Sequence, residues 1–88
     1  MNDLLLFFAG ATVDNIQIST DSPAQGKTLK ELDIRKNSGA TVIAIARNGE
    51  AVTNPGPDFV LQADDIVVLL GAHADLDKAV NLLTKKAI

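Results

Sequence analysis

The strongest constraint on the fold is an uninterrupted apolar run, Ile66 to Leu70. Turn signals bound this run on both sides, because Gln62 to Asp65 reads as a polar turn and Gly71 follows directly. A short apolar run between turn signals is typical of a strand that is buried on both faces. We therefore predict a strand here, within a sheet around which the rest of the chain folds.

A helix able to cover one face of that sheet is predicted near the end of the chain, from Asp75 to Leu83. Its apolar residues recur at the i, i+3, i+4 and i+7 spacing: Leu76, Ala79, Val80 and Leu83. Side chains at this spacing share one helical face, as in an amphipathic helix that packs on a sheet.

An earlier helix is predicted from Leu29 to Lys36. Thr28 followed three residues later by Glu31 is the signature of a capping box, in which the two residues satisfy free amide groups at the start of a helix. Gly39 is a plausible stop, because glycine often ends helices in the left-handed conformation. The polar stretch Ser19 to Gly26 before this helix reads as a loop.

The remaining patterns are those of strands. In Thr12 to Ser19, Ile16 and Ile18 share one face with Gln17 on the other, the period-two pattern of a half-buried strand. Ala40 to Ala46 is rich in β-branched residues. Asn48-Gly49 favours a two-residue hairpin turn, so a return strand, Glu50 to Asn54, should pair with the preceding one. Phe59 to Leu61 is predicted as a short extended piece. The predicted fold is a small two-layer α+β (α/β) domain of order β-α-β-β-β-α, with helices packed on a mainly antiparallel sheet.

The size and composition of the chain predict one domain that associates with itself. Of the 88 residues, 47% are hydrophobic and none is cysteine. A chain this short buries only about 60% of its unfolded surface, and it has no disulfide or thiolate metal site to staple the core. We therefore expect the domain to form a homodimer.

Residues 1–11 are set apart from this domain, which we place at residues 12–88. Their apolar run, Leu4 to Ala9, is interrupted by Gly10 and is far shorter than the roughly 20 residues that span a bilayer as a helix. The segment is open to interpretation as a remnant of a preceding segment, an added edge strand or a dimerisation element, and we favour burial against a second copy. No basic region of a signal peptide precedes Leu4, so we expect a cytoplasmic location.

The charge of the chain argues against a nucleic acid polymer as partner. The net charge is −3, with 8 basic and 11 acidic residues, and the chain has three Phe but no Trp or Tyr. Such a composition supplies neither a positive field along a phosphate backbone nor a stacking platform for bases.

Catalytic and metal-binding motifs are weak. His73 is the only histidine, and Asp75 and Asp77 near it are better explained as complements of a helix dipole than as metal ligands. Asp64-Asp65 is interpreted as solvated turn chemistry rather than as a cation site. Gly26-Lys27-Thr28 mimics the end of a phosphate-binding loop that would need a glycine where Asp21 stands. We expect neither an enzyme nor a metal site.

A rigid loop and one arginine are the candidate recognition features. Asn54 to Asp58 contains two prolines, which limit its backbone freedom, and rigid exposed loops often carry recognition. Arg35, at the end of the first predicted helix, is the basic residue that we single out. Arg47, next to the hairpin turn, is interpreted as an exposed charge.

Four stretches together resemble a known family. They are Ser22-Pro23-Ala24-Gln25-Gly26-Lys27-Thr28-Leu29-Lys30-Glu31-Leu32, Gly39-Ala40-Thr41-Val42-Ile43-Ala44-Ile45, Pro57-Asp58-Phe59-Val60-Leu61-Gln62 and Asp65-Ile66-Val67-Val68-Leu69-Leu70-Gly71. In this order and spacing, over about Val13 to Leu83, they are similar to the RCK_C domain, also called TrkA-C. Asp64 stands where this family usually has glycine, and aspartate tolerates a positive φ better than most residues.

The resemblance implies an accessory domain of prokaryotic potassium channels, potassium uptake systems and cation/proton antiporters, not an enzyme. Domains of this kind usually dimerise and couple the binding of a ligand to transport. We expect the membrane partner to be a K+/H+ or Na+/H+ antiporter. The alternative is a purely structural dimerisation module that binds no ligand.

The resemblance also implies a ligand site. In members that sense cyclic di-AMP, the nucleotide lies across the dimer interface, and the matching positions here are Arg35, Thr41, Val42 and Pro57. Arginine suits a phosphate because its planar guanidinium donates two parallel hydrogen bonds, while Val42 and Pro57 can pack against a purine. Lys30 stands where an apolar contact is usual in those receptors, and Thr41 where an amide side chain is common.

Overall fold

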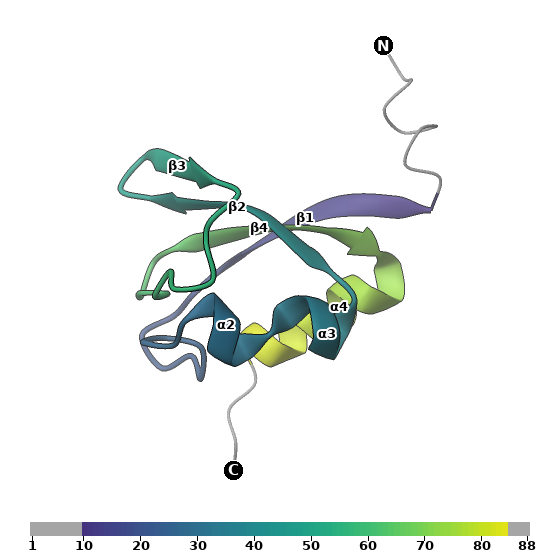
Figure 1. The fold of residues 1–88 in the computed structure, drawn as a ribbon, viewed down its shortest axis with the longest axis horizontal. Helices are drawn as coiled ribbons and strands as arrows, with labels where there is room; N and C mark the ends of the chain where they lie inside the picture. The colour runs from purple at the N-terminus through teal and green to yellow at the C-terminus, as the bar shows by residue number, and fades with distance from the viewer. Residues whose placement is uncertain (1–9, 85–88) are drawn as a thin grey trace.

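The computed structural model describes residues 10–84 of the chain. Its elements follow in the order β1 (Ala11–Gln17), α2 (Leu29–Leu32), α3 (Ile34–Ser38), β2 (Thr41–Arg47), β3 (Glu50–Thr53), β4 (Ile66–Ala72) and α4 (His73–Thr84) (Figure 1). The predicted order β-α-β-β-β-α is confirmed, with the first helix in two pieces.

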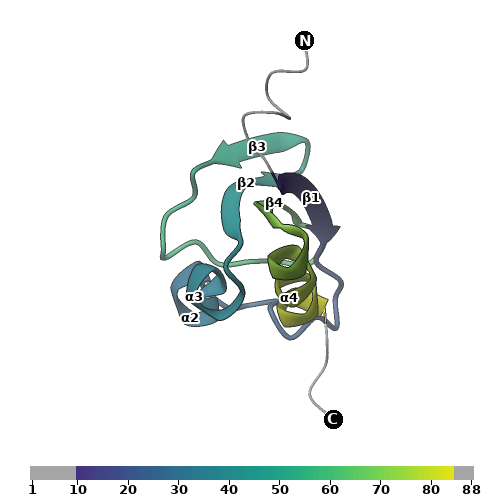
Figure 2. The same ribbon diagram turned by 90° about the vertical axis from the view of Figure 1, so that its right-hand side faces the viewer.

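The strands form one four-stranded sheet with the order β1-β4-β2-β3. Every neighbouring pair is antiparallel, and β4 lies between β1 and β2. All three helices cover the same face of this sheet, as Figure 2 shows from the side. The fold is therefore a two-layer α+β domain, as the sequence predicts.

The apolar run in β4 is buried on one face only, so the prediction of burial on both faces is wrong for this chain. Val67 and Leu69 face the helices and are 0% exposed. Their neighbours point to the other face, where Ile66 is 38% exposed and Val68 and Leu70 are half-buried. The physical reason is that the helices cover a single face, and successive strand residues alternate between faces.

The core lies between β4, β2 and the helices. Its buried apolar residues come from every layer and from the loops that close it: Ile18, Ala24, Leu32, Ile34, Ala40, Ile45, Leu61, Val67, Leu69, Leu76, Ala79 and Leu83. The predicted apolar face of the last helix is confirmed for Leu76, Ala79 and Leu83, which are buried in this cluster, while Val80 is half-buried.

The first predicted helix, Leu29 to Lys36, is broken at Asp33. Asp33 has φ 45° and ψ 54°, so it ends α2 and begins α3 in the left-handed conformation. Short polar side chains such as aspartate enter this region more readily than most. The prediction of one continuous helix is therefore wrong, although Gly39, with φ 90°, does end α3 as expected.

The turn between β2 and the edge strand β3 matches its sequence signal. Asn48 and Gly49 have φ values of 53° and 80°, the positive pair that a tight hairpin between β2 and β3 requires. β2 also contains a bulge between Val42 and Ala44, where its register with β4 shifts. A bulge bends the strand locally, and this one begins at Val42.

The expectations for the N-terminal apolar run fall on residues 1–9, which lie outside the described residues. Within residues 10–84, no helix has the length and apolar character to cross a membrane.

Candidate functional site

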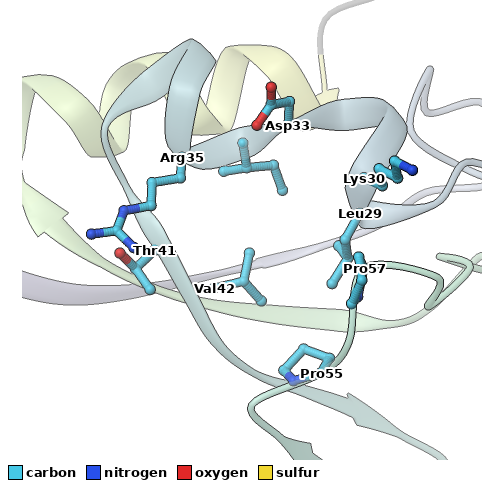
Figure 3. Close-up of a pocket in the computed structure, with 9 residues that line it drawn as sticks. Leu29, Lys30, Asp33, Arg35, Thr41, Val42, Pro55 and Pro57 are labelled. Carbon is cyan, nitrogen blue, oxygen red and sulfur yellow. The ribbon is translucent and has the colours of Figure 1, made fainter.

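A pocket of about 550 Å³ opens between the first helices, the start of β2 and the proline loop. Its lining combines apolar and charged side chains from these elements: Leu29, Lys30, Asp33, Ile34, Arg35, Thr41, Val42, Pro55 and Pro57. Figure 3 shows Arg35 and Thr41 at one end, Leu29 and Pro57 at the other, and Val42 between them.

All four residues singled out for ligand binding line this one pocket. Arg35 comes from α3, Thr41 and Val42 from the start of β2, and Pro57 from the loop after β3. Residues up to 22 positions apart are therefore brought together, and the proline loop is part of the site. Their role in binding a ligand remains a prediction.

The helix side of the pocket depends on two local structures. The capping box fixes the start of α2, because the Glu31 amide donates to Thr28 Oγ1 at 3.1 Å and the Thr28 amide donates to Glu31 Oε1 at 2.9 Å. Hydrogen bonds from the Thr28 amide and hydroxyl hold the pKa of the Glu31 carboxyl below its ordinary value. The break at Asp33 then restarts the helix so that Ile34, 4% exposed, belongs to both the core and the pocket.

Residues 54–60, whose Pro55 and Pro57 line the pocket, form one of its walls and are called the proline wall. This wall is hydrogen-bonded to both neighbouring elements. The Lys30 amide donates to the Pro57 carbonyl at 2.9 Å, and the Leu29 amide donates to the Phe59 carbonyl at 3.0 Å. On the other side, the Asn54 amide donates to the carbonyl of Ile43, in the β2 bulge, at 3.0 Å. The wall is thereby anchored to α2 and to β2.

The charges of the pocket favour an anion with an apolar body. Lys30 and Arg35 are basic, and Asp33 is the one acidic lining residue, so the lining carries a formal charge of +1. Within the described residues, the Arg35 side chain makes no hydrogen bond or ion pair. A guanidinium free in this way can pair with a phosphate. Leu29, Val42 and Pro57 form an apolar floor, which offers a surface for a flat ring.

A second polar centre lies next to the pocket, and the sequence reasoning missed it. Arg47 Nε donates to Asp65 Oδ1 at 2.8 Å, and Arg47 Nη2 donates to Asp65 Oδ2 at 2.7 Å. Asp65 is 1% exposed, so its interpretation as solvated turn chemistry is wrong, as is that of Arg47 as a simply exposed charge. The turn itself is as expected, because Asp64 has φ 74°.

We expect the domain to be less stable in acid, because protonation of Asp65 removes its ion pair with Arg47. Hydrogen bonds from Arg47 lower the pKa of Asp65 below its ordinary value of 3.8; burial opposes this shift, and the Gln62 amide adds to it. The lowered pKa means that the stabilisation is complete above the unfolded-state value and is lost as pH falls through the folded-state value. The free energy of unfolding should therefore drop below about pH 4.

Urea denaturation between pH 2 and pH 7 measures this effect. Glu31 also has a lowered pKa, so the free energy of unfolding of the wild type depends on pH through both carboxyls. Asp65→Asn removes only one of them and should give a visibly shallower fall in acid. An equally steep fall in the variant would contradict the assignment.

Among residues 10–84, no three histidine or acidic side chains lie close enough together to hold a metal ion. Asp75 lies in the first turn of α4, the position expected of a residue that complements the helix dipole.

The sequence comparison identifies the family. The TrkA-C domain model matches residues 15–84, so the chain belongs to the TrkA-C domain family, also called RCK_C. The resemblance drawn from the four sequence stretches is thereby confirmed.

Two relatives illustrate where such domains occur. A probable potassium channel protein 2 of Methanocaldococcus jannaschii is 38% identical over 69 residues, which are 78% of this chain and 20% of the channel protein. The K(+)/H(+) antiporter subunit KhtT of Bacillus subtilis is 32% identical over 82 residues, which are 92% of this chain and 50% of KhtT. The chain thus spans half or less of the length of these relatives.

Solved structures share the fold. The RCK C domain of KtrA in complex with c-di-AMP has a TM-score of 0.77 at 26% identity and covers 90% of this chain and 91% of its own. The RCK_C domain dimer of S. agalactiae BusR in complex with c-di-AMP has a TM-score of 0.69 at 30% identity, covering 75% and 87%. A longer BusR structure, of which this chain covers 43%, is in complex with its busAB-promotor DNA.

Proposed function

We propose that this chain is a cytoplasmic regulatory domain of a monovalent cation transporter, such as a K+/H+ or Na+/H+ antiporter. In this proposal two copies form a homodimer, and their pockets together bind a small anionic nucleotide such as cyclic di-AMP. The observation that carries the proposal is the meeting of Arg35, Thr41, Val42 and Pro57 in one pocket.

The shape and charge of the pocket support a ligand that two copies share. In one chain the pocket offers Arg35 at one end of its apolar floor. A two-fold dimer presents the same residues twice, so a ligand with two identical halves meets two equivalent pockets. A cyclic dinucleotide has this symmetry, with one phosphate for each arginine and one purine for each apolar floor.

Regulation then follows from a shift between dimer geometries. A ligand changes an equilibrium only by its difference in affinity for the two states. Coupling energies of about 1–3 kcal/mol are typical of such effects, and they correspond to changes of about 5- to 150-fold. A nucleotide that touches both copies has such a difference in affinity, because only one geometry brings both arginines to it.

The competing proposal is a structural dimerisation module in which Arg35 pairs with an acidic residue of the second copy. Isothermal titration of wild type and Arg35→Ala with cyclic di-AMP, cyclic di-GMP, ATP and ADP separates the two. We expect tight binding of cyclic di-AMP to the wild type and at least a tenfold loss in Arg35→Ala, since charge-assisted hydrogen bonds to phosphate are among the strongest. Sedimentation should show an intact dimer for both chains.

The opposite pattern would overturn the ligand proposal. A variant with a weakened dimer, together with a wild type that binds none of the nucleotides, favours the structural module. The polymeric DNA bound to BusR is not part of this proposal, because the ligand expected here is a small nucleotide.

A further inference from the structure

The side chain of Arg47 connects three segments that are separate in the sequence. It leaves the end of β2, makes the two hydrogen bonds to Asp65 in the turn before β4, and donates from Nη2 to the Val60 carbonyl at 2.9 Å. Its guanidinium carbon also lies 4.8 Å from the centroid of the Phe59 ring. We call Arg47, Asp65, Phe59 and Val60 the arginine clasp.

The carboxylate of the clasp is held from two sides. Asp65 Oδ2 accepts from Arg47 and also from the Gln62 amide, at 2.8 Å. The carboxylate is almost completely buried, while the arginine side chain is 30% exposed. A buried carboxylate with this many donors fixes its arginine in one geometry, because any other geometry leaves a buried charge unpaired.

The arginine clasp contacts the end of the proline wall, at Phe59 and Val60. Phe59 and Val60 follow Pro57 after one intervening residue, Asp58, and the Phe59 amide donates to the Gly56 carbonyl at 3.1 Å, closing a turn around Pro57 and Asp58. The Leu29 amide donates to the carbonyl of Phe59, the residue whose ring the guanidinium faces. Phe59 is thus held by its ring from β2 and by its backbone from α2.

The segment has other attachments besides the clasp, and directly after it the Leu61 amide donates to the Lys27 carbonyl at 2.9 Å while the Leu61 carbonyl accepts from the Gly26 amide at 2.7 Å. At its start the wall is hydrogen-bonded to β2 through Asn54, and at its middle to α2 through Lys30. Val60 joins no strand and makes a single isolated bridge to Thr28. The ladder of the sheet therefore does not fix this segment, and the clasp is its connection to the end of β2 and to the turn before β4.

We propose that Arg47 is a positioning residue for the ligand pocket: through the arginine clasp it holds Pro57 at the distance from Val42 that a bound ring requires. Arg47 does not line the pocket itself, so it acts through Phe59 and Val60. This inference rests on the proposed function, since it assigns a residue to that same site. Lysine cannot replace arginine here, because a single ammonium lacks the planar fork that bonds Asp65 and Val60 at once.

The test compares Arg47→Lys with Leu83→Val, a change at a buried core residue of α4 that neither lines the pocket nor belongs to the clasp. Cyclic di-AMP affinity is measured by isothermal titration, stability by urea denaturation, and wall docking by NMR hydrogen exchange of the Leu29 and Lys30 amides. We expect Arg47→Lys to weaken binding about tenfold and to speed exchange at both amides, because small misplacements of a positioning group have effects of this size or larger. Leu83→Val should keep its affinity within about twofold despite its lower stability.

Two results would overturn the inference. One is wild-type affinity in Arg47→Lys, and the other is a loss of affinity no larger than that of Leu83→Val at equal stability. If the wild type binds none of the nucleotides, the proposed function fails, and the amide exchange alone decides: unchanged protection at Lys30 in Arg47→Lys refutes the clasp as the element that holds the wall.

Discussion

Replacing Leu69 by alanine is expected to lower the free energy of unfolding by about 2–5 kcal/mol. Leu69 is 0% exposed in the middle of β4, and it pairs across to Asp14 in β1 and to Val42 in β2. Its loss leaves a cavity at the centre of the core, beneath the helices. Small domains have a total stability of only about 5–15 kcal/mol, so urea denaturation of the variant should show a strongly shifted midpoint.

The matched control for this change is Leu70→Ala, the same substitution one residue along the same strand. Leu70 points to the uncovered face of the sheet and is only half-buried. Its replacement should cost clearly less than that of Leu69, because less apolar area is lost from the interior. Equal losses for the two variants would contradict one-sided burial of β4.

Thr41→Asp is expected to weaken cyclic di-AMP binding by about 100-fold or more. Thr41 lies at the same end of the pocket as Arg35, where the proposed phosphate binds (Figure 3). A carboxylate there repels the phosphate and competes for the guanidinium, and like charges brought together in an interface cost several kcal/mol. Each tenfold loss of affinity corresponds to about 1.4 kcal/mol, so isothermal titration will detect it.

Thr41→Asn is the matched control, because asparagine has nearly the same shape as aspartate without its charge. Binding should stay within about tenfold of the wild type, since the amide can still donate to a phosphate oxygen. Similar losses for Asp and Asn would place the phosphate away from Thr41. Thermal unfolding of both variants controls for misfolding.

Local signals predicted local structure well. The capping box at Thr28 and Glu31 and the hairpin turn at Asn48-Gly49 are both observed, because each depends on residues within three positions of one another. The break of the first helix at Asp33 was missed because no glycine or proline marks it. Its only sequence signal is an aspartate, which tolerates the left-handed conformation but also occurs within helices.

Longer-range features could not be predicted in the same way. Arg47 and Asp65 are 18 residues apart, and nothing in the pattern of either segment indicates that they meet. The apolar run of β4 predicted a strand correctly, yet a single sequence cannot say which of its faces the helices cover. Without the fold, neither the pair nor the one-sided burial is visible.

The pocket illustrates how resemblance and structure contribute differently. Arg35, Thr41, Val42 and Pro57 were assigned through the family resemblance, and no spacing rule would join them. The structure adds Leu29 and Ile34 as apolar lining, together with Pro55 from the loop that the sequence had indicated as a recognition feature. Lys30 and Asp33 complete the lining and give this pocket its own charge pattern.

Native mass spectrometry of the domain with cyclic di-AMP tests the central claim most directly, because it counts chains and ligands in one species. A ligand shared between two equivalent pockets predicts a dimer that carries one nucleotide, with no ligand-bound monomer. A monomer with its own nucleotide would contradict the shared site, and a dimer that binds none would leave the structural module as the function of this chain.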